Sequence, residues 1–138
     1  MPDLSGSCLC GAVTYTSSAD PLFTAVCHCA DCQKQTGTAF SVVVGVPGDA
    51  FEVDGELSVH TTVGGDSDAD THRHFCGACG SPVVSYAEGM PGVAIIKAGT
   101  LNDTSWLAPQ LEVWHSRAQP WLDGGAERPT FERSLPTG

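Results

Sequence analysis

Basic side chains are scarce in this sequence, which has 6 Lys and Arg against 16 Asp and Glu and a formal net charge of −10. Nucleic-acid binding generally requires a basic surface that displaces counterions from phosphates, and six scattered cations do not supply one. The sequence also lacks any apolar run near the ~20 residues that cross a bilayer. We therefore expect neither nucleic acid nor a membrane as a partner, and the sequence leaves the oligomeric state open.

A secretory signal is absent from residues 1–6, which have neither a basic region nor an apolar core. We therefore expect a cytoplasmic protein, and cytosolic thiols are kept reduced. The cysteine count of 7 is odd, so disulfide pairing alone would leave one thiol over. The compartment and the count both favour metal coordination over disulfides.

Helix-forming segments are few, whereas the 16 glycines and 9 prolines are typical of short strands joined by turns. One helix is expected at 30–35, with Gly37 at its end, and an exposed acidic loop at 66–70. Alternating or β-branched runs predict strands at 11–16, 39–46, 57–63, 82–86, 93–98 and 111–115. We therefore predict a mainly β fold of roughly eight short strands in small sheets. Residues 1–138 should form one domain, and its tail at about 123–138 should be partly irregular and held by Trp121, Leu122 and Phe131.

Two pairs of cysteines, Cys8 with Cys10 and Cys76 with Cys79, have spacings suited to zinc. Tetrahedral zinc places thiolate sulfurs roughly 3.8 Å apart, because each Zn–S bond is about 2.3 Å long. The Cys76–Cys79 pair has the spacing of a zinc knuckle, in which Gly80 allows the tight turn. Cys8 and Cys10 point to the same side of an extended segment, so they can complete the site. Four cysteine ligands leave no open position, which is typical of a structural zinc.

The remaining three cysteines, Cys27, Cys29 and Cys32, lie within six residues. Three protein ligands with one open position are typical of a catalytic zinc. Spacing alone leaves two alternatives: Cys27 and Cys29 could join the Cys76 knuckle, or a histidine such as His28 could close a second structural site. His28 should point away from the ion of its neighbours in an extended segment. We favour the division into four ligands and three.

These cysteine blocks lie in longer segments that resemble the glutathione-dependent formaldehyde-activating enzyme family, which also includes centromere protein V. The segments are 6–15, 27–40, 73–82 and 109–121, and they occur in family order across nearly the whole chain. The resemblance implies a β-tent of small antiparallel sheets around zinc. It also implies a structural zinc at Cys8, Cys10, Cys76 and Cys79, and a catalytic zinc at Cys27, Cys29 and Cys32.

The resemblance further implies a carbon–sulfur lyase activity that joins glutathione to formaldehyde. The expected function is a zinc-dependent lyase that acts on an adduct of glutathione, or another small thiol, with formaldehyde or a related aldehyde. The substrate thiol should react as a thiolate at the open zinc position, because thiols that bind zinc are deprotonated. The alternative is a non-catalytic zinc module that binds glutathione, a small thiol or a protein partner. The second zinc could be lost if its thiols oxidise.

Glutathione carries two carboxylates, which need cations in an acidic protein. Lys34, two residues after Cys32, is the expected contact, ahead of Arg73, Lys97 and Arg117. The sequence names neither the true thiol nor the true aldehyde.

Overall fold

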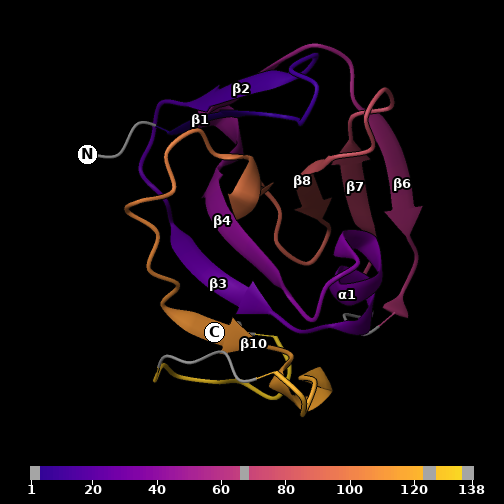
Figure 1. The fold of residues 1–138 in the computed structure, drawn as a ribbon, viewed down its shortest axis with the longest axis vertical. Helices are drawn as coiled ribbons and strands as arrows, with labels where there is room; N and C mark the ends of the chain where they lie inside the picture. The colour runs from indigo at the N-terminus through magenta and orange to yellow at the C-terminus, as the bar shows by residue number, and fades with distance from the viewer. Residues whose placement is uncertain (1–3, 66–68, 123–126, 135–138) are drawn as a thin grey trace.

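Strands dominate the computed structural model, which describes residues 4–65, 69–122 and 127–134 (Figure 1). The strands are β1 (Leu4–Ser7), β2 (Thr14–Ser17), β3 (Phe23–Cys27), β4 (Ser41–Pro47), β5 (Phe51–Asp54), β6 (Ser58–Thr62), β7 (Thr71–Phe75), β8 (Pro82–Ala87), β9 (Val93–Lys97) and β10 (Leu111–Val113). The helical elements are α1 (Ala30–Thr36) and the 3-10 turns η1 (Gly48–Ala50), η3 (Ala98–Thr100) and η4 (His115–Arg117). The predicted mainly β fold is therefore confirmed. In the described ranges, no helix combines the length and the apolar character that crossing a membrane requires.

The strands form two sheets. β1, β2 and β5 make a three-stranded antiparallel sheet, and the other strands make a seven-stranded sheet in the order β10-β3-β4-β9-β8-β7-β6. Neighbours in the large sheet are antiparallel except for β10 and β3, which are parallel. Figure 1 shows the large sheet curved, so that α1, which follows β3, lies beside β6 and β7 near the other end of the sheet.

Each of the six predicted strands overlaps an observed one, and the helix is also confirmed. Its end at Gly37 has the left-handed conformation, with φ of 68°, that glycine adopts without strain. The prediction missed β1, β3, β5 and β7. β7 has the sequence Thr-His-Arg-His-Phe, in which polar side chains hide the alternation. Residues 66–68 of the predicted acidic loop lie outside the described residues.

The two faces of the large sheet have different roles because successive side chains of a strand point to opposite sides. Val44 and Val46 of β4 and Ile96 of β9 are completely buried on one face. They pack against the small sheet, including Leu4 and Tyr15, and form the main hydrophobic core. The opposite face carries Cys27 at the end of β3, so that face positions the candidate site.

The described part of the C-terminal tail runs beside β10. Thr130 forms a parallel bridge with Glu112, and the Phe131 N–H donates to the Glu112 carbonyl at 2.8 Å. The expectation that Phe131 holds the tail is thus met. Trp121 and Leu122 do not hold it, since they are 69% and 45% exposed. Residues 123–126 and 135–138 of the predicted tail lie outside the described residues.

Candidate functional site

The first and last cysteine pairs meet in one cluster. The sulfurs of Cys8, Cys10, Cys76 and Cys79 all lie within 4.8 Å of one another. The Cys8–Cys10 sulfur distance is 3.7 Å and the Cys10–Cys76 distance is 3.8 Å, which match the ~3.8 Å edge of a tetrahedral zinc–thiolate site. The donor set and its spacing therefore fit zinc, and this cluster can hold the ion with four ligands.

Two tight turns build this four-cysteine cluster: one carries Cys8 and Cys10, and the other carries Cys76 and Cys79. The Gly80 N–H donates to the Cys76 carbonyl at 2.7 Å, with Gly80 at a φ of 80°, which favours glycine. The Leu9 N–H donates to the Ser81 hydroxyl oxygen at 3.0 Å, so the two turns are also joined directly. Hydrogen bonds from the Ser81 side chain and backbone lower the pKa of Cys79 to about 5. These hydrogen bonds favour the thiolate form of Cys79, which is the form that binds metal.

The sulfurs of Cys27, Cys29 and Cys32 form a second, separate cluster, again within 4.8 Å of one another. Cys27 ends β3, Cys29 is the N-terminal cap of α1, and Cys32 lies in its first turn. The Cys32 N–H donates to the Cys29 sulfur at 3.3 Å, and the Cys27 and Cys32 sulfurs are 3.5 Å apart. The short loop after β3 and the first turn of α1 together bring three thiols close to one another. Three thiol ligands fit a zinc ion that keeps one coordination position for an external ligand. The alternative in which Cys27 and Cys29 join the Cys76 knuckle is wrong in this fold.

Two buried cations lie beside this three-cysteine cluster. Nη1 of Arg73 is 4.0 Å from the Cys32 sulfur and donates to Gln35 Oε1 at 2.9 Å. Nζ of Lys97 donates to the Ser41 hydroxyl at 3.0 Å. Hydrogen bonds with Cys27 and Cys29 hold the pKa of Cys32 well below its usual range, and the charges of Lys97 and Arg73 lower it further against the effect of burial. The two cations thus favour the thiolate form of Cys32.

Trp114, the residue between β10 and η4, lies against the same sulfurs. Its side chain is buried and packs with Cys29 and Cys32. The residue has a φ of 55° and is the described non-glycine residue with a left-handed backbone, a conformation that costs about 1–3 kcal/mol and often marks functional sites. Arg133 lies over its ring at 5.0 Å from the centroid. The indole therefore forms an apolar wall for the cluster.

Two cavities lie near this cluster, and its three cysteines line the first of them. The first, here called the apolar pocket, has a volume of about 180 Å³ and is lined by the three cysteines and by Ala25, Val43, Ile95, Met90, Leu111 and Trp114, among others. The second, called the polar cleft, has a volume of about 430 Å³ and is lined mainly by Asp31, Lys34, Gln35, His60, Thr62 and Arg73. Asp31 and Arg73 line both. The two cavities therefore adjoin at Asp31 and Arg73, next to the sulfurs that line the apolar pocket.

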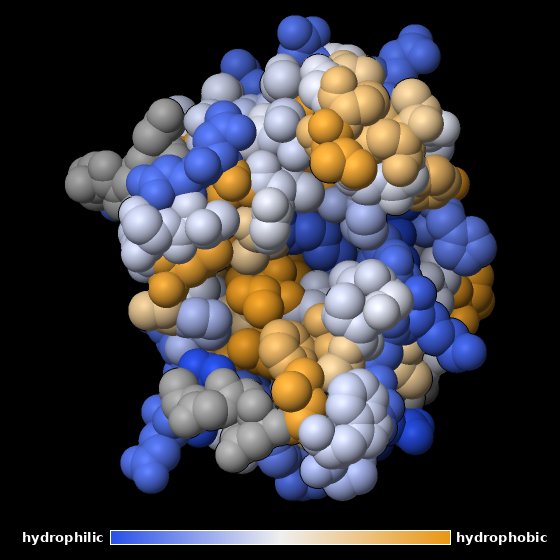
Figure 2. Space-filling view, in the orientation of Figure 1, coloured by the Kyte–Doolittle hydropathy of each residue, from blue (hydrophilic) through white to orange (hydrophobic). Residues whose placement is uncertain are grey.

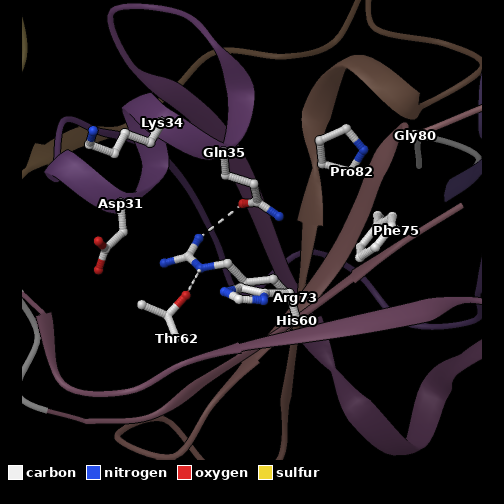
Figure 3. Close-up of a pocket in the computed structure, with 9 residues that line it drawn as sticks. All are labelled: Asp31, Lys34, Gln35, His60, Thr62, Arg73, Phe75, Gly80 and Pro82. Carbon is white, nitrogen blue, oxygen red and sulfur yellow. Dashed lines mark hydrogen bonds between the residues drawn. The ribbon is translucent and has the colours of Figure 1, made fainter. Parts of the chain in front are cut away.

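The polar cleft is organised around Arg73 (Figure 3). Its guanidinium donates to Thr62 of β6 and to Gln35 of α1, so it links the sheet to the helix. Lys34, the cation expected to contact substrate, projects from α1 away from Arg73 in this view. It lies exposed at the cleft. Lys97 and Arg73, rather than Lys34, are the cations beside the sulfurs, and Arg117 lines neither cavity.

A buried ion-pair network that the sequence analysis missed lies behind the three-cysteine cluster. His28 Nε2 is 2.6 Å from Glu112 Oε1, and Arg128 Nε donates to Glu112 Oε2 at 2.9 Å. The bonds with His28 and Arg128 hold the pKa of Glu112 below its usual value although burial raises it. His28 lies between Cys27 and Cys29, and its ring is held by Glu112, as expected for a side chain that points away from their sulfurs. The signal in the sequence was a carboxylate within the apolar strand Leu-Glu-Val.

Replacing Glu112 by alanine is expected to lower the free energy of unfolding by roughly 3 kcal/mol, because it leaves buried partners without their counter-charge. The matched control is Glu88→Ala. Glu88 pairs with His72 at 3.2 Å but is 60% exposed, so its loss should change stability by less than about 0.5 kcal/mol. Urea unfolding measures both. Equal losses of unfolding free energy in the two variants would contradict the inference that Glu112 stabilises the segment of Cys27 and Cys29 through its contact with His28.

Comparisons with known proteins agree with this geometry. The profile of the family described as "Glutathione-dependent formaldehyde-activating enzyme" matches residues 3–117. A Talaromyces marneffei protein named "Putative glutathione-dependent formaldehyde-activating enzyme" is 28% identical over 112 residues, which are 79% of this chain and 59% of that protein. The chain thus spans less than two thirds of that relative's length. A crystal structure of a Rhodobacter sphaeroides protein, a structural genomics target, matches the fold with a TM-score of 0.58 at 17% identity, over 77% of this chain and 92% of the other.

Proposed function

Because this chain belongs to the glutathione-dependent formaldehyde-activating enzyme family, we propose that it makes and breaks a carbon–sulfur bond between a small thiol, such as glutathione, and formaldehyde or a related aldehyde. The observation that carries the proposal is the convergence of Cys27, Cys29 and Cys32 beside two buried cations, in the lining of a pocket that shares Asp31 and Arg73 with the polar cleft. The four-cysteine cluster has no free coordination position, so the reaction is assigned to the cluster of three.

A zinc ion held by Cys27, Cys29 and Cys32 would supply a fourth coordination position for the substrate sulfur and lower the pKa of that thiol. Lys97 and Arg73 offset the negative charge of the cysteine and substrate sulfurs. In the forward reaction the sulfur attacks the carbonyl carbon, a C–S bond forms, and the π electron pair moves to the oxygen. The oxygen then takes up a proton in place of the one that the thiol released. The lyase direction is the reverse.

The polar cleft supports glutathione as the thiol. Its volume of about 430 Å³ lies in the range of ~300–1,000 Å³ that encloses small ligands. Arg73 lines the cleft with its Nη1 4.0 Å from the Cys32 sulfur, and Lys34 is exposed on α1. A peptide whose sulfur reaches the cysteines could place a carboxylate at Lys34, which we retain as the substrate contact.

The remaining features follow the family resemblance. We assign a structural zinc to the cluster of Cys8, Cys10, Cys76 and Cys79, and a β-tent to the two sheets beside it. The Gly6–Leu101 bridge joins the small sheet to the turn after β9, and the main core includes residues of both sheets. Both observations support one domain over residues 1–138.

The proposal is tested by the rate at which zinc-loaded protein accelerates adduct formation between formaldehyde and a thiol, followed by NMR exchange. We expect acceleration with glutathione, and a KM for glutathione that Lys34→Ala raises about two- to fivefold, as for loss of one exposed charge contact. The KM for 2-mercaptoethanol, which has no carboxylate, should change less, and Lys34→Arg should restore the glutathione value. Binding of glutathione without any acceleration would instead identify a non-catalytic binding module.

A further inference from the structure

We propose that the apolar pocket binds the alkyl group of an aldehyde larger than formaldehyde, and that the Ser85 hydroxyl hydrogen-bonds the oxygen of the same substrate. This inference rests on the proposed function and names its carbonyl substrate as a short apolar aldehyde. The bond changes are those already given for formaldehyde: the C–S bond forms at the carbonyl carbon, the proton ends on the oxygen, and the alkyl group is unchanged.

The pocket is built from one face of the large sheet. Across the strands, Ala25 of β3 pairs with Val43 of β4, Val43 with Lys97 of β9, and Ile95 of β9 with Ser85 of β8. These side chains therefore share the face that carries Cys27, which is two residues beyond Ala25 on β3. Apolar side chains thus continue directly from the sulfurs. Figure 2 shows hydrophobic surface in a hollow near the centre of the molecule, with hydrophilic surface beside it.

The size of the pocket argues for a short alkyl group. Its volume of about 180 Å³ is below the ~300 Å³ at which pockets begin to enclose drug-sized ligands, so a tripeptide does not fit and belongs in the polar cleft. Formaldehyde has no substituent and would leave the apolar wall without contacts. Apolar cavities of ~150 Å³ bind molecules of the size of benzene. The pocket therefore fits the part of the carbonyl substrate that formaldehyde lacks.

Ser85 supplies the second, independent observation. Its side chain lines the pocket and is only 4% exposed. Its hydroxyl is buried without a hydrogen-bond partner among the described residues. A buried hydroxyl that lacks a partner destabilises the fold, so its presence in the pocket that the three cysteines also line indicates a ligand oxygen. Lys97, on the same face, already donates to Ser41 at 3.0 Å.

The first experiment measures kcat/KM for each of five aldehydes, with glutathione as the common thiol. The aldehydes are formaldehyde, ethanal, propanal, butanal and pentanal. Each added methylene that enters the pocket should raise kcat/KM about fourfold, as expected from the free energy of burying a methylene. Ala87, at the end of β8, also lines the pocket and is half-buried, so Ala87→Leu should lower the pentanal-to-formaldehyde ratio at least about tenfold. The matched control Ala50→Leu, at a half-buried alanine of η1 outside both cavities, should leave that ratio unchanged. A wild-type series that is flat or falls with chain length would overturn the inference.

The second experiment measures binding without any reaction, by calorimetric titration of the zinc-loaded protein with pentan-1-ol and ethanol. Pentan-1-ol should bind more tightly, by about fourfold per methylene. Ser85→Ala should weaken its binding about five- to tenfold, as for one lost hydrogen bond, while the thermal midpoint stays equal or rises because an unpaired hydroxyl is removed. A lowered midpoint would show a structural role for Ser85 and contradict its assignment.

The two experiments separate failure of this inference from failure of the proposed function. Alcohol binding that depends on chain length and on Ser85, in a protein that makes no thiol adduct with any aldehyde, would refute the reaction and support the pocket. Acceleration with formaldehyde, with no preference among aldehydes and no binding of pentan-1-ol, would support the reaction and refute the pocket.

Discussion

Replacing Cys76 by serine is expected to leave the protein largely unfolded at 25 °C and to remove one equivalent of zinc. Structural zinc contributes apparent free energies of roughly 10–16 kcal/mol in small metal-folded domains, whereas the net stability of a domain is only ~5–15 kcal/mol. Cys76 is 1% exposed and belongs to the main core. Serine therefore removes a zinc ligand and also buries an unpaired hydroxyl. Circular dichroism, urea unfolding and zinc analysis measure the result.

The control variant Val83→Ala separates the effect of losing the metal from the effect of losing core packing. Val83 is fully buried in the same core but has no ligand atom, so its truncation should lower the free energy of unfolding by about 2–3 kcal/mol and leave the zinc content at two equivalents. Treatment of the wild type with a chelator should reproduce the Cys76→Ser state. If the chelated protein and Cys76→Ser unfold within a few degrees of the wild type, the four-cysteine cluster is not a structural zinc site.

Cys29→Ser is expected to keep the fold but to lose the second equivalent of zinc and to reduce adduct formation by ~10³-fold or more, because the thiol then lacks its activating ion. The three sulfurs pack with Trp114 in a small cluster separate from the main core, so the loss of the Cys29 sulfur should lower the free energy of unfolding by no more than ~2 kcal/mol. Activity and urea unfolding measure the two effects.

Cobalt substitution provides a spectroscopic readout of the same sites. In the wild type, two cobalt ions should bind and only one absorption spectrum should shift when glutathione is added. In Cys29→Ser one ion should remain and its spectrum should not respond to thiol. Unfolding of Cys29→Ser to the extent of Cys76→Ser would show instead that both clusters are structural.

The cysteine clusters were predictable because metal chemistry restricts how thiols can be spaced. The predicted grouping of Cys8 and Cys10 with Cys76 and Cys79 needed only bond lengths and strand geometry, and it matches the observed convergence of their sulfurs. Helix α1 was predictable because Gly37 marks its C-terminal end. Strands such as β4 and β9 were visible as β-branched runs.

The residues around the three-cysteine cluster could not be predicted from the sequence, because the fold brings distant segments together there. Lys34 follows Cys32 by two residues, and residues at that spacing face different sides of a helix, so closeness in sequence placed it outside the sulfur cluster. Arg73 is 41 residues from Cys32 and reaches it through the register of β7. Ser85 looks like an ordinary polar residue in β8 until its neighbours across the sheet are known. Registers between distant strands are set by packing, which local sequence does not encode.

The alternation of core and site residues along β4, β8 and β9 also limits how the chain can change in length. Ile96 lies in the core and Lys97 lies in the site, and an insertion or deletion of one residue within β9 would exchange their faces. It would place an ammonium group among valines and remove it from the cysteines at once. New substrate preferences in this scaffold should therefore arise by substitution within strands, while changes of length collect in connections such as residues 88–92.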